Sequence, residues 1–292
     1  MTHHARRAAA AALCALAAAA APPASAAHLR TITERIFPFE PGGAIDIQSQ
    51  NGRIVVDTWE RQEVRVQITR EVRGPDDEHE RALMRQLTAD VQVEPHGIRI
   101  RSIYPKHQKV VGIWDLLGQG VRSANIHYYL QVPRETSLHL TTANGVVRVR
   151  GTQGTMVANT TNGDIDVSAV RGLVEAHTTN GEVRIAKVEG PVNAGTTNGS
   201  IAAELTALPQ RGEMNVETTN GNIALTLPTD LHATVEANTT NGRVNINYKV
   251  TMRGMITSKR VHGEIGGGGP RIHLETTNGN IDVGPPRARA SH

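Results

Sequence analysis

The sequence predicts an all-β fold, a single-stranded β-helix (β-solenoid) of about nine rungs joined by Asn-Gly turns. The first observation is a repeat, because Thr-Thr-Asn-Gly or a close variant recurs along the chain, in part at intervals of 18 residues. The second is alternation, since every other position on both sides of these turns is apolar. The third is composition: aromatic residues make up only 3% of the chain, which fits a narrow, closely packed interior.

Residues 1–26 have the form of a secretory signal peptide. Arg6 and Arg7 give a positive start, residues 8–21 are apolar, and residues 24–26 (Ala-Ser-Ala) form a small-residue cleavage site. The arginine pair also fits a twin-arginine signal, although two arginines alone are weak support. The apolar run is too short to span a bilayer, and no later stretch has the length of a transmembrane helix. We expect export to the periplasm or the cell exterior.

Composition excludes several classes of protein. Cleavage of the signal peptide removes Cys14, the one cysteine of the chain, so the mature protein has neither a disulfide nor a cysteine-based zinc site. Lys plus Arg is 31 and Asp plus Glu is 28, a balance that argues against a polybasic segment for nucleic acid or membranes. We therefore expect no nucleic-acid partner and no cofactor.

Residues 27–137 predict a β-rich N-terminal part with one helix. The segments with strand composition are Ile45–Ile68, Val91–Ile103 and Ile126–Val132. Residues 75–78 (Pro-Asp-Asp-Glu) predict the start of a helix over about residues 76–89, because acidic side chains favour a helix N-terminus. We expect widened first rungs with this helix as a cap, since a bare terminal rung exposes unpaired backbone.

An apolar loop lies between glycines at residues 110–117. Its largest side chains, Trp114, Leu116 and Leu117, either cover the end of the core or form an exposed contact patch. The sequence leaves both alternatives open.

Residues 138–283 carry the regular repeats, and residues 284–292, rich in Pro and Arg, are expected to form a disordered tail. We interpret the turn residues as structural, because Asn in a turn with positive φ, followed by Gly, is a sufficient cause for the motif. A degenerate copy at residues 261–265 (Val-His-Gly-Glu-Ile) predicts a ninth turn. The turn residues are Asn51, Gly52, Asn144, Gly145, Asn162, Gly163, Asn180, Gly181, Asn198, Gly199, Asn220, Gly221, Asn241, Gly242, Asn278 and Gly279.

Asn-Gly between alternating runs is also the strongest short signal for a hairpin. A long meander of hairpins would leave its apolar face uncovered, and residues 141–283 supply no second layer. A coil that winds once per repeat buries its own apolar face and stacks like residues at a rise of about 4.8 Å. The solenoid is therefore the interpretation we favour.

These repeats resemble the bacterial putative-adhesin family of β-strand repeats, a domain family of unknown function. The pattern is Thr-Thr-Asn-Gly-x-Ile/Val, and residues 37–39 (Phe-Pro-Phe), 42–45 (Gly-Gly-Ala-Ile) and 51–54 (Asn-Gly-Arg-Ile) before Trp59 fit as well. The resemblance covers most of residues 27–283. It implies a right-handed single-stranded β-helix and no established activity.

Candidate catalytic residues are sparse. Asp164 and Glu182 fall one rung apart on an outward column, and two carboxylates about 5 Å apart suit a retaining glycosidase or a calcium ion. Their column neighbours, Val146 and Ser200, add no further acid or base. We therefore assign no catalytic, cofactor-binding or metal-ligating residue.

A second outward column carries Arg148, Asp166 and Arg184 on successive rungs. We interpret this column as an exposed structural ladder of alternating charge.

The sequence favours an exported, non-enzymatic β-solenoid that acts as an adhesin-like binding or scaffold module of the cell envelope. Its expected partners are envelope polysaccharide or an envelope protein. One alternative is a polysaccharide lyase or hydrolase built on a β-helix, which rests on analogy of fold. The other is an assembly role in which solenoids stack or dimerise.

Overall fold

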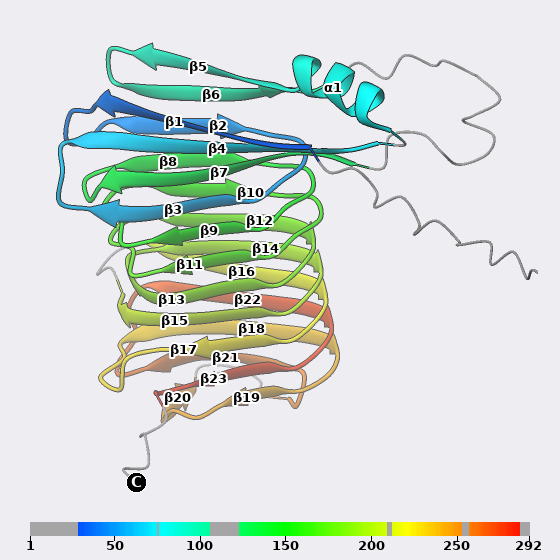
Figure 1. Ribbon diagram of the computed structural model, residues 1–292. Coiled ribbons are helices and arrows are strands. Elements are labelled where there is room, and N and C mark those ends of the chain that lie inside the picture. Colours follow the sequence, from blue (N-terminus) through cyan, green and yellow to red (C-terminus); the bar gives the residue numbers. More distant parts are fainter. Residues whose placement is uncertain (1–28, 75, 106–122, 209–211, 253–256, 287–292) are drawn as a thin grey trace, which may run out of the picture.

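The computed structural model describes residues 29–74, 76–105, 123–208, 212–252 and 257–286. The predicted signal peptide, the apolar loop 110–117 and residues 287–292 lie outside the described residues. The chain forms two long sheets that face each other and enclose the core (Figure 1). This arrangement is the β-solenoid that the repeat predicts.

The two sheets have 11 and 12 strands, and we call them sheet A and sheet B. Sheet A contains, in spatial order, β1 (Leu29–Pro38), β4 (Glu63–Arg73), β7 (Ser123–Pro133), β3 (Ile54–Trp59), β9 (Val147–Arg150), β11 (Ile165–Ser168), β13 (Val183–Glu189), β15 (Ile201–Ala207), β17 (Ile223–Thr226), β23 (Ile281–Gly284) and β19 (Val244–Ile246). Sheet B contains β20 (Val250–Met252), β21 (Arg260–Ile265), β18 (Ala233–Asn241), β22 (Arg271–Asn278), β16 (Glu213–Asn220), β14 (Val192–Asn198), β12 (Val174–Asn180), β10 (Met156–Asn159), β8 (Ser137–Thr141), β2 (Ala44–Gln48), β6 (Gly97–Ile103) and β5 (Thr88–Glu94).

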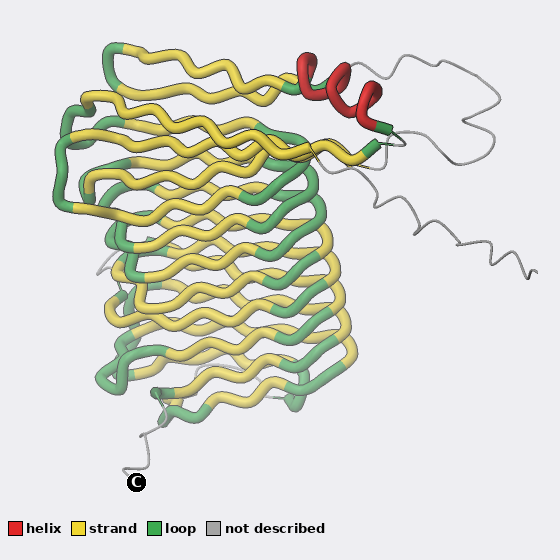
Figure 2. Tube along the Cα trace, viewed as in Figure 1, coloured by secondary structure: helices red, strands yellow, loops and turns green. Residues whose placement is uncertain are grey.

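Each Asn-Gly turn carries the chain from a strand of sheet B to a strand of sheet A, as from β8 to β9. A rung is therefore one sheet B strand, its turn and the sheet A strand that follows, and neighbouring rungs pair in parallel. The strands and the segments that connect them stack rung on rung (Figure 2). The turns join facing sheets, so the hairpin meander is excluded.

The core is built from the inward columns of both sheets. Residues six and four positions before each turn asparagine are buried in every rung with an Asn-Gly turn, from Ile45 and Ile47 to Val235 and Ala237. The facing column from sheet A is Ile or Val and is buried in every rung with an Asn-Gly turn except that of Val244, which is partly buried. In the regular rungs these side chains are aliphatic, mostly Ala, Val and Ile, so the two sheets pack closely there, and the buried Tyr128 lies only in the first rungs.

The N-terminal end departs from chain order. β6 pairs with β2 and β7 pairs with β3, so β6 and β7 form a rung stacked on the earlier rung of β2 and β3. Tyr104 lies where this rung would carry its asparagine. Its hydroxyl accepts a hydrogen bond from the backbone N–H of Asn51 (2.9 Å) and donates one to the backbone carbonyl of Asn51 (2.6 Å). Tyr104 thereby closes one end of the column of turns.

One helix, α1 (Asp77–Gln86), lies at this end and contacts β1 and β4. Its N-cap is Asp76, whose carboxylate accepts the amide hydrogen bond of His79 at 2.9 Å. Met84 and Leu87 bury its apolar side in the core. The helix ends at Gln86, before the expected end near residue 89, because β5 begins at Thr88.

The C-terminal end also departs from chain order. β22 lies between β16 and β18, and β23 lies between β17 and β19, so the last rung is inserted between two earlier ones. The predicted ninth turn at residues 261–265 is wrong, because this segment belongs to β21, which runs antiparallel to β18. The chain returns from β21 to β22 through Gly266, Gly267 and Gly268, which all have positive φ.

Candidate binding faces

The turn asparagines form one continuous ladder. Asn51 begins the ladder as an acceptor, and the Nδ2 of every other turn asparagine donates to the Oδ1 of the asparagine on the neighbouring rung at 2.7–2.9 Å. The spatial order is Asn51, Asn144, Asn162, Asn180, Asn198, Asn220, Asn278 and Asn241. None of them has positive φ, so the backbone explanation given from sequence is wrong and the side-chain ladder accounts for the residue type.

A buried threonine lies two positions before seven of the eight asparagines, and in six of these rungs its Oγ1 donates to a glycine carbonyl of the neighbouring rung. Thr142 is the exception, since its Oγ1 makes no hydrogen bond to a described residue. In Thr178 and Thr196, for example, Oγ1 donates to the carbonyls of Gly163 and Gly181 at 3.0 and 3.1 Å. The position after each turn asparagine must be glycine. A Cβ on any of the eight turn glycines would lie 1.9–2.1 Å from a carbonyl oxygen of the neighbouring rung. Close stacking of backbones, more than turn conformation, therefore selects Gly.

The carboxylates of Asp164 and Glu182 belong to an ion-pair network on the outer face of sheet A. The Arg184 guanidinium lies 3.6 Å from Asp164 and also pairs with Glu182. The same guanidinium lies 3.6 Å from Asp166, which Arg148 approaches to 3.1 Å from the other side. All five side chains are partly exposed. The arrangement is a charge ladder, and the arginine between the two carboxylates leaves no acid–base pair.

The outer face of sheet B carries a hollow of about 420 Å³. The hollow lies over Gly195, which has no side chain, and the side chains of His177 and Glu217 flank it on the two neighbouring rungs. Exposed threonines complete the lining, and Glu275 lies beside Glu217 on the next rung. The hollow is polar and contains no aromatic side chain.

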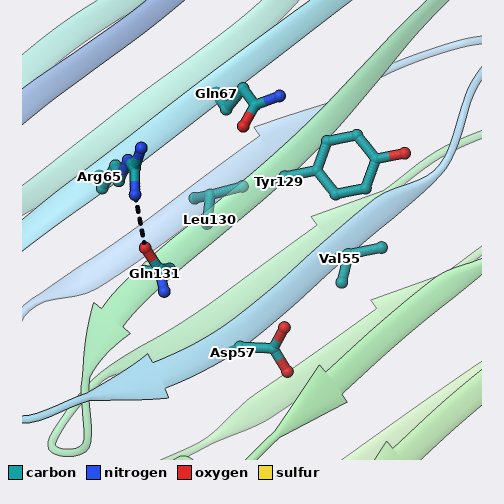
Figure 3. Close-up of a pocket in the computed structure, with 7 residues that line it drawn as sticks. All are labelled: Val55, Asp57, Arg65, Gln67, Tyr129, Leu130 and Gln131. Atoms are coloured by element: carbon teal, nitrogen blue, oxygen red, sulfur yellow. Dashed lines mark hydrogen bonds between the residues drawn. The ribbon is translucent and has the colours of Figure 1, made fainter.

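The outer face of sheet A carries a smaller hollow of about 190 Å³, over β3, β7 and β4. Figure 3 shows the Tyr129 ring between Gln67 and Val55, with Arg65 donating a hydrogen bond to Gln131 at 3.2 Å. Asp57 completes the polar lining. The alternation Ile126, Tyr128, Leu130, Val132 places Tyr129 on the outer face, so the sequence contained a signal for this site that we did not use.

Two residues of β7 that immediately precede Tyr129 in the region of this hollow, Tyr128 and His127, have shifted pKa values. Burial raises the pKa of the Tyr128 hydroxyl, which points into the core and lies 2.6 Å from Ser102 Oγ. Burial also lowers the pKa of His127, an effect that the neighbouring Glu71 opposes. Both shifts come from packing within the first rungs.

Three further features of the sequence concern the apolar loop, metal binding and membrane spans. Trp114, Leu116 and Leu117 lie outside the described residues. Among the residues that the structure describes, no group of three or more His, Asp, Glu or Cys side chains is arranged to hold a metal ion. In the same residues, no helix has the length and apolar character to cross a bilayer.

The fold and its stacked turns define a parallel β-solenoid with two flat outer faces. Residues 173–284, the C-terminal part of the repeat region, match the family model described as Toastrack DUF4097. The resemblance to the bacterial putative-adhesin repeats is thereby confirmed. No curated protein matches the chain.

Several solved structures are similar over most of the chain. A putative cell adhesion protein from Clostridium sporogenes is 13% identical, with 87% of this chain and 99% of that chain covered, at a TM-score of 0.36. A putative adhesin from Bacteroides fragilis is 11% identical, with 87% and 97% covered, at a TM-score of 0.42. A putative lipid binding protein from Parabacteroides distasonis is 13% identical, with 87% and 96% covered, at a TM-score of 0.32.

Proposed function

We propose that this protein is an exported, non-enzymatic module that binds a component of the cell envelope on an outer face of its solenoid. The observation that supports this proposal is the pair of long sheets, whose outer faces carry columns of mainly polar side chains that repeat at the spacing of the rungs. A surface with one repeat direction suits a partner that is itself extended, such as an envelope polysaccharide or a rod-like protein. No cofactor is needed for such binding.

The alternative, a polysaccharide lyase or hydrolase, needs an acid and a base that are free to exchange protons. Asp164 and Glu182 are the pair that the sequence offers, and Arg184 lies against both carboxylates. Both carboxylates are therefore engaged in an ion pair with the same guanidinium, which lies between them. The geometry therefore favours binding over cleavage.

Nucleic acid is disfavoured as a partner by the outer face of sheet B. Its outward columns carry Glu175, Glu217, Glu236 and Glu275. These carboxylates would repel a phosphate backbone, which proteins bind chiefly through Lys and Arg.

The test is a binding screen of residues 27–292 against peptidoglycan, lipopolysaccharide, a glycan array and solubilised envelope proteins, with an assay for new sugar ends in the same wells. Binding without new ends is the expected result. Release of reducing or unsaturated ends would establish the enzyme, and an Asp164→Asn variant would then be the next experiment. Absence of binding to every fraction would overturn the proposal.

Export is tested separately by expressing the full chain in a Gram-negative host and fractionating the cells. We expect a periplasmic or secreted protein whose N-terminus is Ala27. An uncleaved cytoplasmic product would contradict the predicted signal peptide.

A further inference from the structure

Tyr129 is an aromatic side chain on the solvent-facing side of a sheet, in a protein that has few aromatic residues. Its neighbour Tyr128 points the other way, is fully buried and supports the core. The Tyr129 ring is half-buried on the outer face and lines the sheet A hollow. Core packing therefore explains Tyr128 and does not explain Tyr129.

The strand register surrounds this ring with polar groups. Gln67 of β4 and Val55 of β3 lie directly opposite Tyr129 on its two sides, at the spacing of cross-strand neighbours. Gln131 lies two residues further along β7, on the same face, and Asp57 and Arg65 lie directly opposite it. All of these side chains face one hollow of about 190 Å³ (Figure 3).

Several of these groups have unused hydrogen-bonding capacity. The Asp57 carboxylate, the Gln67 amide and the Tyr129 hydroxyl make no hydrogen bond to any described residue. Arg65 is held in place, because it pairs with Glu34 at 2.6 Å and donates to Gln131 Oε1 at 3.2 Å. The Gln131 side chain is therefore oriented with its amide nitrogen still available as a donor.

We propose that this hollow binds one pyranose ring of a neutral polysaccharide. A pyranose has an apolar C–H face, which stacks on an aromatic ring, and a rim of hydroxyls that both donate and accept. Two amides, a carboxylate and a phenol match that rim. The Arg65 charge is already compensated by Glu34, and Asp57 would repel an anion, so the hollow favours an uncharged sugar.

The volume supports a polymer rather than a small free ligand. Pockets that enclose whole drug-sized molecules have about 300–1,000 Å³. A hollow of 190 Å³ would hold a single ring, so the remainder of the ligand would lie across the sheet. This inference rests on the proposed envelope-binding function and specifies its ligand class and its face.

A second hollow of about 230 Å³ lies further along the same strands. Trp59 of β3 and Pro133 of β7 line it, and the Arg61 guanidinium lies 5.1 Å from the Trp59 ring. Trp59 is four residues beyond Val55, the neighbour of Tyr129, which corresponds to about 13 Å along the strand. A polysaccharide chain that runs parallel to β3 would reach both aromatic side chains.

The test is titration of residues 27–292 with neutral cello-, malto- and chito-oligosaccharides, from disaccharides to hexasaccharides. We expect Tyr129→Ala to weaken binding of the preferred series about tenfold or more, since it removes the stacking ring. Tyr129→Phe keeps the ring and should lose less affinity. Trp59→Ala should weaken the longer oligosaccharides and leave disaccharide binding unchanged. Thr197→Ala, in the sheet B hollow, is the matched control and should bind as the parent protein does.

Each outcome separates this inference from the broader function. The Tyr129 variants should retain the parent melting temperature, because the side chain lies outside the core. Oligosaccharide binding that survives Tyr129→Ala and is lost in Thr197→Ala would move the site to sheet B and overturn the inference. Binding to envelope protein but to no oligosaccharide would also overturn it and leave the envelope-binding function standing. Binding to neither would overturn both.

Discussion

At the scale of single residues, each member of the Thr-Thr-Asn-Gly motif has its own physical role. The first threonine is buried and donates to a glycine carbonyl of the neighbouring rung, whereas the second is exposed. The asparagine forms the side-chain ladder, and the glycine lets the backbones of successive turns approach each other. The motif recurs because these three different contacts are repeated along the stack of rungs.

Asn180→Ala should lower the free energy of unfolding by about 1–3 kcal/mol. The substitution removes two hydrogen bonds of 2.8 Å, to Asn162 and from Asn198, and each exposed bond contributes about 0.5–1.5 kcal/mol net. Urea unfolding followed by far-UV circular dichroism measures the difference. Thr179→Ala, the exposed neighbour, is the control, and an equal loss in both variants would argue against the ladder.

Gly199→Ala should destabilise the fold by about 1–3 kcal/mol through steric overlap. The added methyl group would lie 1.9 Å from the Gly181 carbonyl oxygen, a backbone atom that is fixed by pairing. In the control Gly195→Ala, the new methyl group meets the His177 side chain, which can move aside. Thermal unfolding should therefore separate the two variants, and equal melting temperatures would contradict the close-stacking explanation.

His127 should make the protein less stable in mild acid. Its Nδ1 accepts the Arg53 amide at 3.0 Å, so the folded state prefers the neutral ring, and burial lowers its pKa from 6.5. Because the unfolded chain then binds a proton more readily, stability from this group is present above pH 6.5 and is lost as the pH falls. Glu71, 3.5 Å from Nε2, reduces the effect, while the charges of Arg53 and Arg30 add to it.

The measurement is urea unfolding of the parent and a His127→Gln variant at pH 7.5 and pH 5. The parent should lose more stability between these values than the variant, since glutamine does not titrate. Parallel losses in both proteins would assign the pH dependence to other groups.

At the scale of elements, the C-terminal rung is the link that holds the last part of the solenoid. β22 pairs with β16 on one side and with β18 on the other, and β23 does the same between β17 and β19. β18 and β19 therefore have parallel pairing only through a rung that the chain makes afterwards. The middle rungs, by contrast, pair with their neighbours in chain order.

Truncation after Pro270 should unfold β18 to β21 and leave the middle rungs intact. The physical reason is that the removed rung provides the parallel partner of both β18 and β19. Hydrogen exchange should show fast amides in β18, β19, β20 and β21 and retained protection in β12 to β15. Truncation after Pro286, which keeps β23, is the control, and retained protection of β18 in the shorter chain would contradict the insertion.

At the scale of the whole molecule, stability is close to a sum over rungs, because each rung contacts its two neighbours. The ends differ from the middle: α1, β1 and β5 complete one end, and the antiparallel strands β20 and β21 complete the other. The interior is uniform enough that one rung is equivalent to the next where the spacing is 18 residues.

Deletion of residues 146–163 should therefore give a folded solenoid that is one rung shorter. The deletion removes β9 and β10, one strand from each sheet, and so brings β3 beside β11 and β8 beside β12. Every inward column stays in register, because the deleted segment is one whole repeat. Deletion of residues 146–154 alone removes half a rung and should prevent folding, because the next strand would enter the wrong sheet. Circular dichroism and cooperative unfolding distinguish the two. A folded half-rung variant would contradict the register argument.

The sequence by itself determined the solenoid, its turns and its inward columns, because those features are local: alternation selects the face, and Asn and Gly mark each turn. It also placed the helix start at Asp76, since the N-cap is a local signal. Only the tertiary structure decided the order of the rungs at both ends, because strand pairing between distant segments depends on which edge is free when they meet. Likewise, the charges around Arg184 and the hollow at Tyr129 exist only once separate strands lie side by side. The sequence shows each of those side chains singly, and the register of β3, β4 and β7 turns them into a site.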